Sequence, residues 1–150
     1  MFEVNKLDLS KGMPAKVHVQ TTITQNNDTE EFVFDEKGKV VQMGGSYYVR
    51  YEETYQEDGR IPVTFKIEPN GIVTLTRKGD MTTRMRFEQG KSYETLYRTA
   101  QGNIFVDTIT RHLQISYTDK PFSGNVQVAY DLFVGNEKLG EYKIRLLFTV

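Results

Sequence analysis

Hydrophobic and polar residues alternate along most of the chain, from about Lys16 to the C-terminus. A period of two is typical of strands with one buried face, and no stretch shows the period of an amphipathic helix. The pattern predicts strands over residues 16–25, 31–42 with a break at Gly38, 46–56, 61–68, 72–78, 81–87, 91–99, 103–109, 112–118, 124–134 and 138–149.

Short turn signals separate these runs, among them Asp58-Gly59, Asn70-Gly71 and Gln101-Gly102. Links of this length join antiparallel neighbours, because a parallel crossover needs about a dozen residues or more. An open sheet of so many short strands would leave exposed edges, and closure removes them. We therefore predict an all-β protein with a single antiparallel up-and-down barrel over residues 15–150, preceded by a loosely attached arm over residues 1–14.

The inward face of each strand follows from the parity of its apolar residues, since a slip of one residue would reverse the faces. Three-residue turns at 57–59, 78–80 and 88–90 keep this parity from strand to strand. They predict one inward row across five strands, made of Glu53, Val63, Arg77, Met81 and Tyr97. The parity changes between residues 108 and 113, which predicts a β-bulge near Thr110.

Glu53 and Arg77 are the two charged residues that this register places among inward apolar groups. Their backbones are separated by two strand spacings, about 10 Å, so their side chains can meet over Val63. One hypothesis is that Arg77 binds the carboxylate or phosphate of a small ligand at the barrel mouth, near Glu53. Four inward tyrosines would form the walls of this site: Tyr51, Tyr55, Tyr93 and Tyr97.

A structural role is the simpler interpretation of the same residues. Glu53 and Arg77 would then form an ion pair near the rim, with both charged groups in water. The tyrosines would fill the core with their rings and place their hydroxyls at a mouth or against a neighbour.

Composition narrows the classes of function. The chain of 150 residues contains no Cys, which excludes a disulfide framework, a thiolate nucleophile and a thiolate metal site. Charged residues interrupt the apolar residues of the N-terminus, unlike those of a signal peptide, and nothing later approaches the roughly 20 apolar residues of a spanning helix. We therefore expect a cytoplasmic protein without a membrane partner.

The net charge of −1 argues against nucleic acid as a partner. The charges are nevertheless unevenly distributed, with nine acidic and three basic residues over 28–58 and eight basic and four acidic residues over 60–98. The basic stretch 77–98 supports an alternative function as a protein- or nucleic-acid-interaction module. Its outward cations would be Arg84, Arg86 and Arg98.

Signatures of catalysis and metal binding are missing from the sequence. His18 and His112 are predicted to face outward and lack the spacing of metal ligands. Glu52 and Glu53 face opposite sides of one strand, which excludes their action as an acid/base pair. The sequence favours a non-enzymatic protein without a cofactor or a metal ion.

Several segments resemble the uncharacterised bacterial YwiB-like family. They are Tyr47-Tyr48-Val49-Arg50-Tyr51-Glu52-Glu53, Lys66-Ile67-Glu68, Arg77-Lys78-Gly79, Met85-Arg86-Phe87, Tyr97-Arg98-Thr99-Ala100-Gln101-Gly102 and Tyr130-Asp131-Leu132. The similarity extends from about residue 16 to the end. It implies a calycin-like β-barrel of a small cytoplasmic protein of Gram-positive bacteria, and it implies no activity or catalytic residue.

Lipocalins and fatty-acid-binding proteins, the wider fold relatives that this resemblance implies, hold apolar ligands inside the barrel. Transfer of that role to this chain would be an analogy of fold alone. From Arg77 and Glu53 as the polar end and the aromatic residues as the wall, we expect a non-enzymatic barrel that binds a small amphipathic or anionic molecule.

Overall fold

A computed structural model describes residues 8–55 and 59–150 of the chain. This part of the chain contains no helix long and apolar enough to cross a membrane. Ten strands account for nearly all of it: β1 (Met13–Gln25), β2 (Asp28–Met43), β3 (Ser46–Tyr55), β4 (Gly59–Ile67), β5 (Val73–Lys78), β6 (Thr82–Phe87), β7 (Ser92–Thr99), β8 (Gly102–Thr118), β9 (Ser123–Val134) and β10 (Glu137–Thr149).

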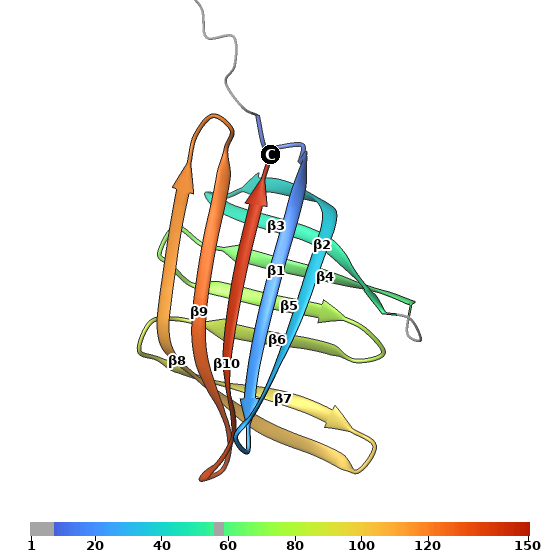
Figure 1. Ribbon diagram of the computed structural model, residues 1–150, viewed down its shortest axis with the longest axis vertical. Coiled ribbons are helices and arrows are strands. Elements are labelled where there is room, and N and C mark those ends of the chain that lie inside the picture. Colours follow the sequence, from blue (N-terminus) through green and yellow to red (C-terminus); the bar gives the residue numbers. More distant parts are fainter. Residues whose placement is uncertain (1–7, 56–58) are drawn as a thin grey trace, which may run out of the picture.

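All ten strands belong to one antiparallel sheet that curls into a nearly closed barrel (Figure 1). Their order is β6-β5-β4-β3-β2-β1-β10-β9-β8-β7, so strands adjacent in the chain pair with each other and β1 pairs with β10. In the described part of the chain, the ladder is interrupted only between β6 and β7. The predicted all-β, antiparallel up-and-down barrel is therefore confirmed.

The barrel is flattened into two layers that cross at a steep angle (Figure 1). Strands β1, β9, β10 and much of β8 follow the long axis, whereas β3 to β6 cross behind them. Strand β2 belongs to both layers, because it pairs with β1 as far as Val40 and with β3 from Lys39 onward.

Gly38 lies where β2 passes from one layer to the other. A Cβ atom there would stand 2.3 Å from the carbonyl oxygen of Arg50 and 2.9 Å from Cγ2 of Val17. Only glycine therefore allows the two layers to approach at this point. The predicted break at Gly38 is wrong, because the strand continues through it.

The core fills the space between the layers, with its largest fully buried apolar side chains drawn from both: Phe65, Phe87, Phe148, Ile67, Leu75 and Leu146. One end of the barrel is occupied by packed aromatic rings. The ring of Tyr47 lies 5.1 Å from that of Tyr117 and 5.3 Å from that of Phe122, which also packs against Phe148. These rings do not extend to the opposite end of the barrel.

The N-terminal segment differs from the prediction of a loose arm over residues 1–14. Leu9 is 6% exposed, and its carbonyl oxygen accepts a hydrogen bond of 2.9 Å from the backbone N–H of Gln42. Strand β1 already begins at Met13. Leu9 thus packs on the barrel and residues 13–14 belong to β1, while the prediction for residues 1–7 falls outside the described residues.

The predicted strands 103–109 and 112–118 are one long strand, β8. Its register against β9 shifts between Thr110 and His112, which confirms the predicted bulge near Thr110. The extra residue restores the alternation of faces, so that Thr108 and Thr110 lie inside before the bulge and Leu113 is half-buried after it.

Among the pairings predicted for the inward row, the one between β4 and β5 is correct, and those between β3 and β4 and between β5 and β6 are shifted. Val63 faces Arg77, as predicted, but Glu53 faces Ile61 and Arg77 faces Thr83. Each shift is two residues, which preserves the faces. The prediction that Met81 faces inward is wrong, because Met81 lies in the turn before β6 begins and is 45% exposed.

The predicted pairing of Met81 with Tyr97 is also wrong. The turn after β6 pairs with β8 instead, since Gly90 donates its N–H to the carbonyl of Thr110, and Thr110 donates its own to the carbonyl of Lys91. These bonds direct β7 along β8 and away from β6, which leaves the seam in the barrel wall.

Candidate functional site

The barrel interior holds a cavity of about 370 Å³ at the end opposite the packed aromatic rings. The lining residues come from both layers: Thr21, Ile23, Phe32, Phe34, Tyr55, Arg77, Met85, Tyr97, Tyr130, Leu132, Tyr142 and Ile144. Apolar and aromatic side chains form most of the wall. The polar groups that remain are one guanidinium, the tyrosine hydroxyls and the hydroxyl of Thr21.

The base of this site is a hydrogen-bonded group around Glu53. Arg77 donates from Nε to Oε1 of Glu53 at 3.1 Å and from Nη2 to Oε2 at 3.3 Å. The hydroxyl of Tyr51 donates to Oε2 at 2.6 Å, and that of Tyr55 donates to Oε1 at 2.8 Å. Four donors thus satisfy one buried carboxylate.

Local strand geometry explains how these groups meet. Tyr51, Glu53 and Tyr55 alternate along β3 and share its inward face. Arg77 reaches them from β5 over Val63, which lies opposite both Tyr51 and Arg77. The predicted contact between Glu53 and Arg77 is present, although the two residues are diagonal neighbours rather than members of one cross-strand row.

The carboxylate of the ion pair is buried and its guanidinium is partly buried, in contrast to the predicted pair with both groups in water. The side chain of Glu53 is 0% exposed and that of Arg77 is 30% exposed. Burial alone would raise the pKa of Glu53, but the hydrogen bonds and charge of Arg77, with the two tyrosine hydroxyls, outweigh it and lower the pKa below its usual value. Glu53 is therefore ionised at neutral pH.

Three of the six predicted site residues line the cavity, namely Arg77, Tyr55 and Tyr97. Glu53 and Tyr51 lie behind them as the support of the guanidinium. Tyr93 is placed elsewhere: its hydroxyl donates to Glu88, and the guanidinium of Arg86 stands 4.8 Å from its ring centre.

The sequence interpretation missed the half of the wall that comes from β1, β2, β9 and β10. Tyr130 and Tyr142 stack there with ring centres 5.1 Å apart, beside Phe34 and Leu132. Their inward parity was visible in the sequence. Their position opposite Arg77 was not, because it depends on the pairing of β1 with β10 and on the crossing of the layers.

Comparison with known proteins identifies the family. Residues 17–146 match the family model described as "Domain of unknown function (DUF1934)". The chain belongs to the DUF1934 family. This confirms the resemblance found in the sequence, because the chain is also 26% identical over 125 residues to the uncharacterized beta-barrel protein YwiB of Bacillus subtilis (strain 168), covering 83% of this chain and 85% of YwiB.

The crystal structure of the ywiB protein from Bacillus subtilis supports the same architecture. It superposes with a TM-score of 0.77 at 22% identity and covers 93% of this chain and 92% of that one. At this identity the likeness shows a shared fold. The chemistry of the DUF1934 barrel described here therefore rests on its own residues.

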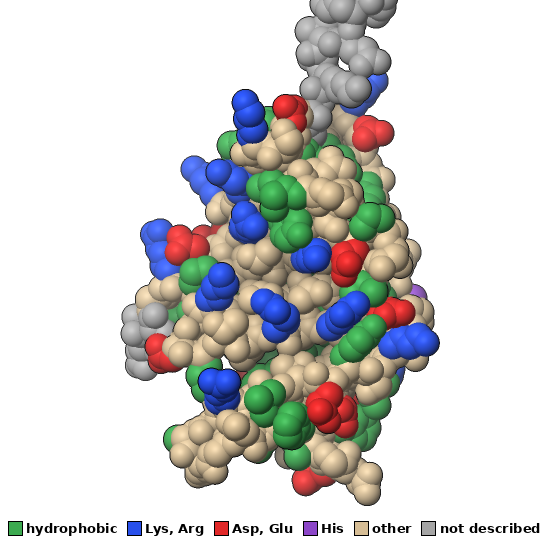
Figure 2. All heavy atoms as spheres, turned by 180° about the vertical axis from the view of Figure 1, so that it is seen from behind, with side chains coloured by type: hydrophobic (Ala, Val, Ile, Leu, Met, Phe, Trp, Pro, Cys, Tyr) green, Lys and Arg blue, Asp and Glu red, His purple; other side chains and the backbone are tan. Residues whose placement is uncertain are grey.

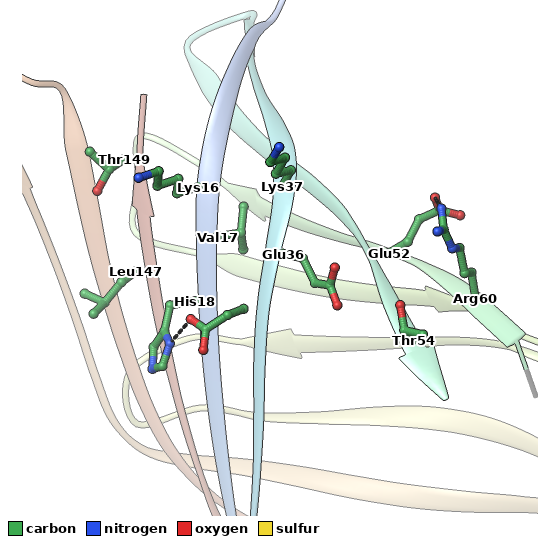
Figure 3. Close-up of a pocket in the computed structure, with 11 residues that line it drawn as sticks. Lys16, Val17, His18, Glu36, Lys37, Glu52, Thr54, Arg60, Leu147 and Thr149 are labelled. Atoms are coloured by element: carbon green, nitrogen blue, oxygen red, sulfur yellow. Dashed lines mark hydrogen bonds and ion pairs between the residues drawn. The ribbon is translucent and has the colours of Figure 1, made fainter. Parts of the chain in front are cut away.

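A second depression of about 790 Å³ lies on the outside of the DUF1934 barrel (Figure 3). Two pairs of its polar side chains satisfy each other: Nδ1 of His18 bonds to Oδ1 of Asp35, and Nη1 of Arg60 lies 3.7 Å from Oε1 of Glu52. Residues 8–55 and 59–150 contain no group of three or more His, Cys, Asp or Glu that could hold a metal ion. The interior cavity is consequently the better candidate site.

Proposed function

We propose that this DUF1934 protein binds a small amphipathic molecule inside its barrel, with the apolar part against the aromatic wall and a polar acceptor group near Arg77. The observation that carries this proposal is the cavity of about 370 Å³ with an apolar wall and an oriented guanidinium. Ligand pockets generally have volumes of about 300–1,000 Å³, mostly apolar walls and a few fixed polar groups.

The group around Glu53 supports this role by fixing Arg77. Two of the five guanidinium N–H donors point to Glu53, and no partner of Nη1 is found among the described residues. Because Glu53 already balances the charge of Arg77, the site favours an acceptor on an amphipathic molecule over a compact, highly charged anion. A carboxylate, a hydroxyl or a carbonyl would satisfy Nη1.

A pair of variants on β1 tests this proposal. Thr21 lines the cavity, whereas Thr22 points to the outer surface. Thr21→Phe should fill part of the cavity, and Thr22→Phe adds the same bulk outside it. Titration of the intact protein with decanoate, followed by native mass spectrometry, should give a one-to-one complex that Thr21→Phe weakens by about tenfold or more. Thr22→Phe should bind like the wild type.

Decanol has a chain of the same length but a hydroxyl in place of the carboxylate, so a comparison with decanoate measures how much the carboxylate contributes to binding. If Nη1 of Arg77 contacts the ligand head group, decanoate should bind more tightly than decanol to the wild-type protein. Equal binding to the Thr21→Phe and Thr22→Phe variants would contradict a ligand site inside the barrel.

A further inference from the structure

The outer face of β2 to β6 carries a group of cations that the linear sequence does not bring together. Apart from Arg60, which lies 3.7 Å from the carboxylate of Glu52, seven Lys and Arg side chains belong to it: Lys37, Lys39, Arg50, Lys66, Lys78, Arg84 and Arg86. Figure 2 shows Lys and Arg side chains spread across the middle of this side of the molecule. We call this set the basic face.

Strand register places these cations in neighbouring rows. Lys39 lies opposite Arg50, and the row continues through Thr64 and Thr76 to Arg84. A second row runs from Tyr48 through Lys66 and Thr74 to Arg86. With adjacent strands about 4.8 Å apart, the five strands spread these charges over about 20 Å.

A depression of about 570 Å³ lies on the part of the basic face formed by β2 to β5. Four cations line it: Lys37, Lys39, Arg50 and Lys78. Glu52 is the single carboxylate among its lining residues, and Arg60 lies 3.7 Å from that carboxylate. The depression therefore has a local excess of positive charge, although the net charge of the whole chain is −1.

The chemistry of this face narrows the kind of partner. Val33 and Met43 are exposed on β2, but none of the exposed large hydrophobic side chains of the described residues lines the depression. A protein interface generally has an apolar centre, and a peripheral membrane site inserts apolar side chains. Cations interspersed with threonine hydroxyls, without such a centre, fit a hydrophilic polyanion.

We infer that the basic face binds the phosphodiester backbone of single-stranded nucleic acid. Lys and Arg contacts to phosphates dominate such binding and do not require base recognition. The ring of Tyr48 lies 5.4 Å from the guanidinium of Arg50 and 5.8 Å from the ammonium of Lys66, which orients both cations on the surface. This site is independent of the interior cavity.

The inference differs from the basic stretch 77–98 considered from the sequence. Arg84 and Arg86 belong to the basic face, whereas Arg98 lies on β7 across the seam. The depression instead depends on Lys37, Lys39 and Arg50 from β2 and β3.

The test compares two double variants that remove the same charges. Arg50→Gln/Lys78→Gln changes the depression, and Lys143→Gln/Arg145→Gln changes exposed cations of β10 on the other layer. Fluorescence anisotropy of a fluorescein-labelled oligouridylate of about 12 nucleotides, at about 50 mM salt, measures binding to the full chain.

Counterion release predicts the size of the effect. Each lost phosphate contact to a single strand should weaken binding about eightfold at about 50 mM salt and reduce the slope of log K against log salt by about 0.7. Arg50→Gln/Lys78→Gln should therefore weaken binding by roughly 60-fold and reduce the slope by about 1.4. The β10 variant should bind within about twofold of the wild type. Thermal unfolding should show that both variants remain folded, and Lys39→Gln/Lys78→Gln replaces the first variant if it does not fold.

Three results would overturn the inference: no binding by the wild-type protein, equal losses in the two double variants, or tighter binding to phosphatidylserine vesicles than to the oligonucleotide. The decanoate titration is a separate readout, so either proposal can fail without the other.

Discussion

Replacement of Arg77 by Met should leave the carboxylate of Glu53 buried without its countercharge. Methionine retains much of the length and apolar volume of the arginine stem, so the main change is the loss of the guanidinium. Glu53 is 0% exposed, and its remaining donors are the hydroxyls of Tyr51 and Tyr55. Two neutral hydrogen bonds cannot replace the ion pair.

The structure also sets the magnitude. Removal of one member of a buried ion pair generally costs about 3–5 kcal/mol. Arg77 is 30% exposed, and two hydroxyl donors stay in place, so we expect Arg77→Met to lower the free energy of unfolding by about 3 kcal/mol at pH 7. Glu53→Gln should cost less, about 1–2 kcal/mol, because the exposed part of Arg77 remains hydrated.

The stability of the wild-type protein and of the two variants should depend on pH in three different ways. In the wild-type protein the pKa of Glu53 lies below its usual 4.5, so its stabilising contribution is complete at neutral pH and is lost as the pH falls through the folded pKa. Glu53→Gln removes this loss. In Arg77→Met, burial without the guanidinium should raise the pKa of Glu53 above its usual 4.5. The destabilisation by the mutation should therefore shrink as the pH falls from neutral through this raised pKa, because the buried carboxylate becomes neutral.

Urea unfolding of the three proteins measures these differences. The chain has no Trp, so far-UV circular dichroism is the suitable signal. An Arg77→Met protein as stable as the wild type at pH 7, or a stability difference that does not change between about pH 7 and pH 5, would refute the reasoning.

Other changes test the packing and the hydrogen bonds around the site by the same unfolding measurement. Gly38→Ala should cost about 3 kcal/mol because its Cβ would meet backbone, while Gly79→Ala, whose Cβ has no atom closer than 3.6 Å, should stay within about 0.5 kcal/mol of the wild type. Phe65→Ala, at a fully buried position, should cost about 3–5 kcal/mol, and a smaller loss would show that the core can collapse around it. Tyr51→Phe removes a donor to Glu53 and should cost about 1–2 kcal/mol at pH 7, and an unchanged stability would mean that this hydrogen bond is not formed.

Much of the fold could be predicted because its determinants are local. Alternation over 46–56 and 61–68, with a short link between them, defines two hairpin partners and their inward faces. The bulge near Thr110 followed from a change of parity alone. Errors arose where the register depends on the length of the turn. A turn that is longer by one residue on each side keeps the same parity, so parity cannot distinguish the two. The partner of Arg77 is therefore Thr83 and not the predicted Met81.

The candidate site was only partly predictable because half of it depends on long-range pairing. Glu53 and Tyr55 come from β3 and Arg77 from β5, which β4 joins through two short hairpins, and parity was sufficient to place them together. Tyr130 and Tyr142 reach the same cavity through strands at the other end of the chain. The position of Tyr93 was wrong because β7 follows β8 and leaves β6, which no feature of residues 88–91 reveals by itself.

Native mass spectrometry of the protein, purified gently from a bacterial host, tests most directly whether the cavity is a ligand site. The proposed function predicts a discrete mass above the sequence mass, or a one-to-one adduct on addition of decanoate, that Thr22→Phe retains and Thr21→Phe loses. An unliganded mass with no decanoate adduct, or an adduct that both variants retain equally, would contradict it.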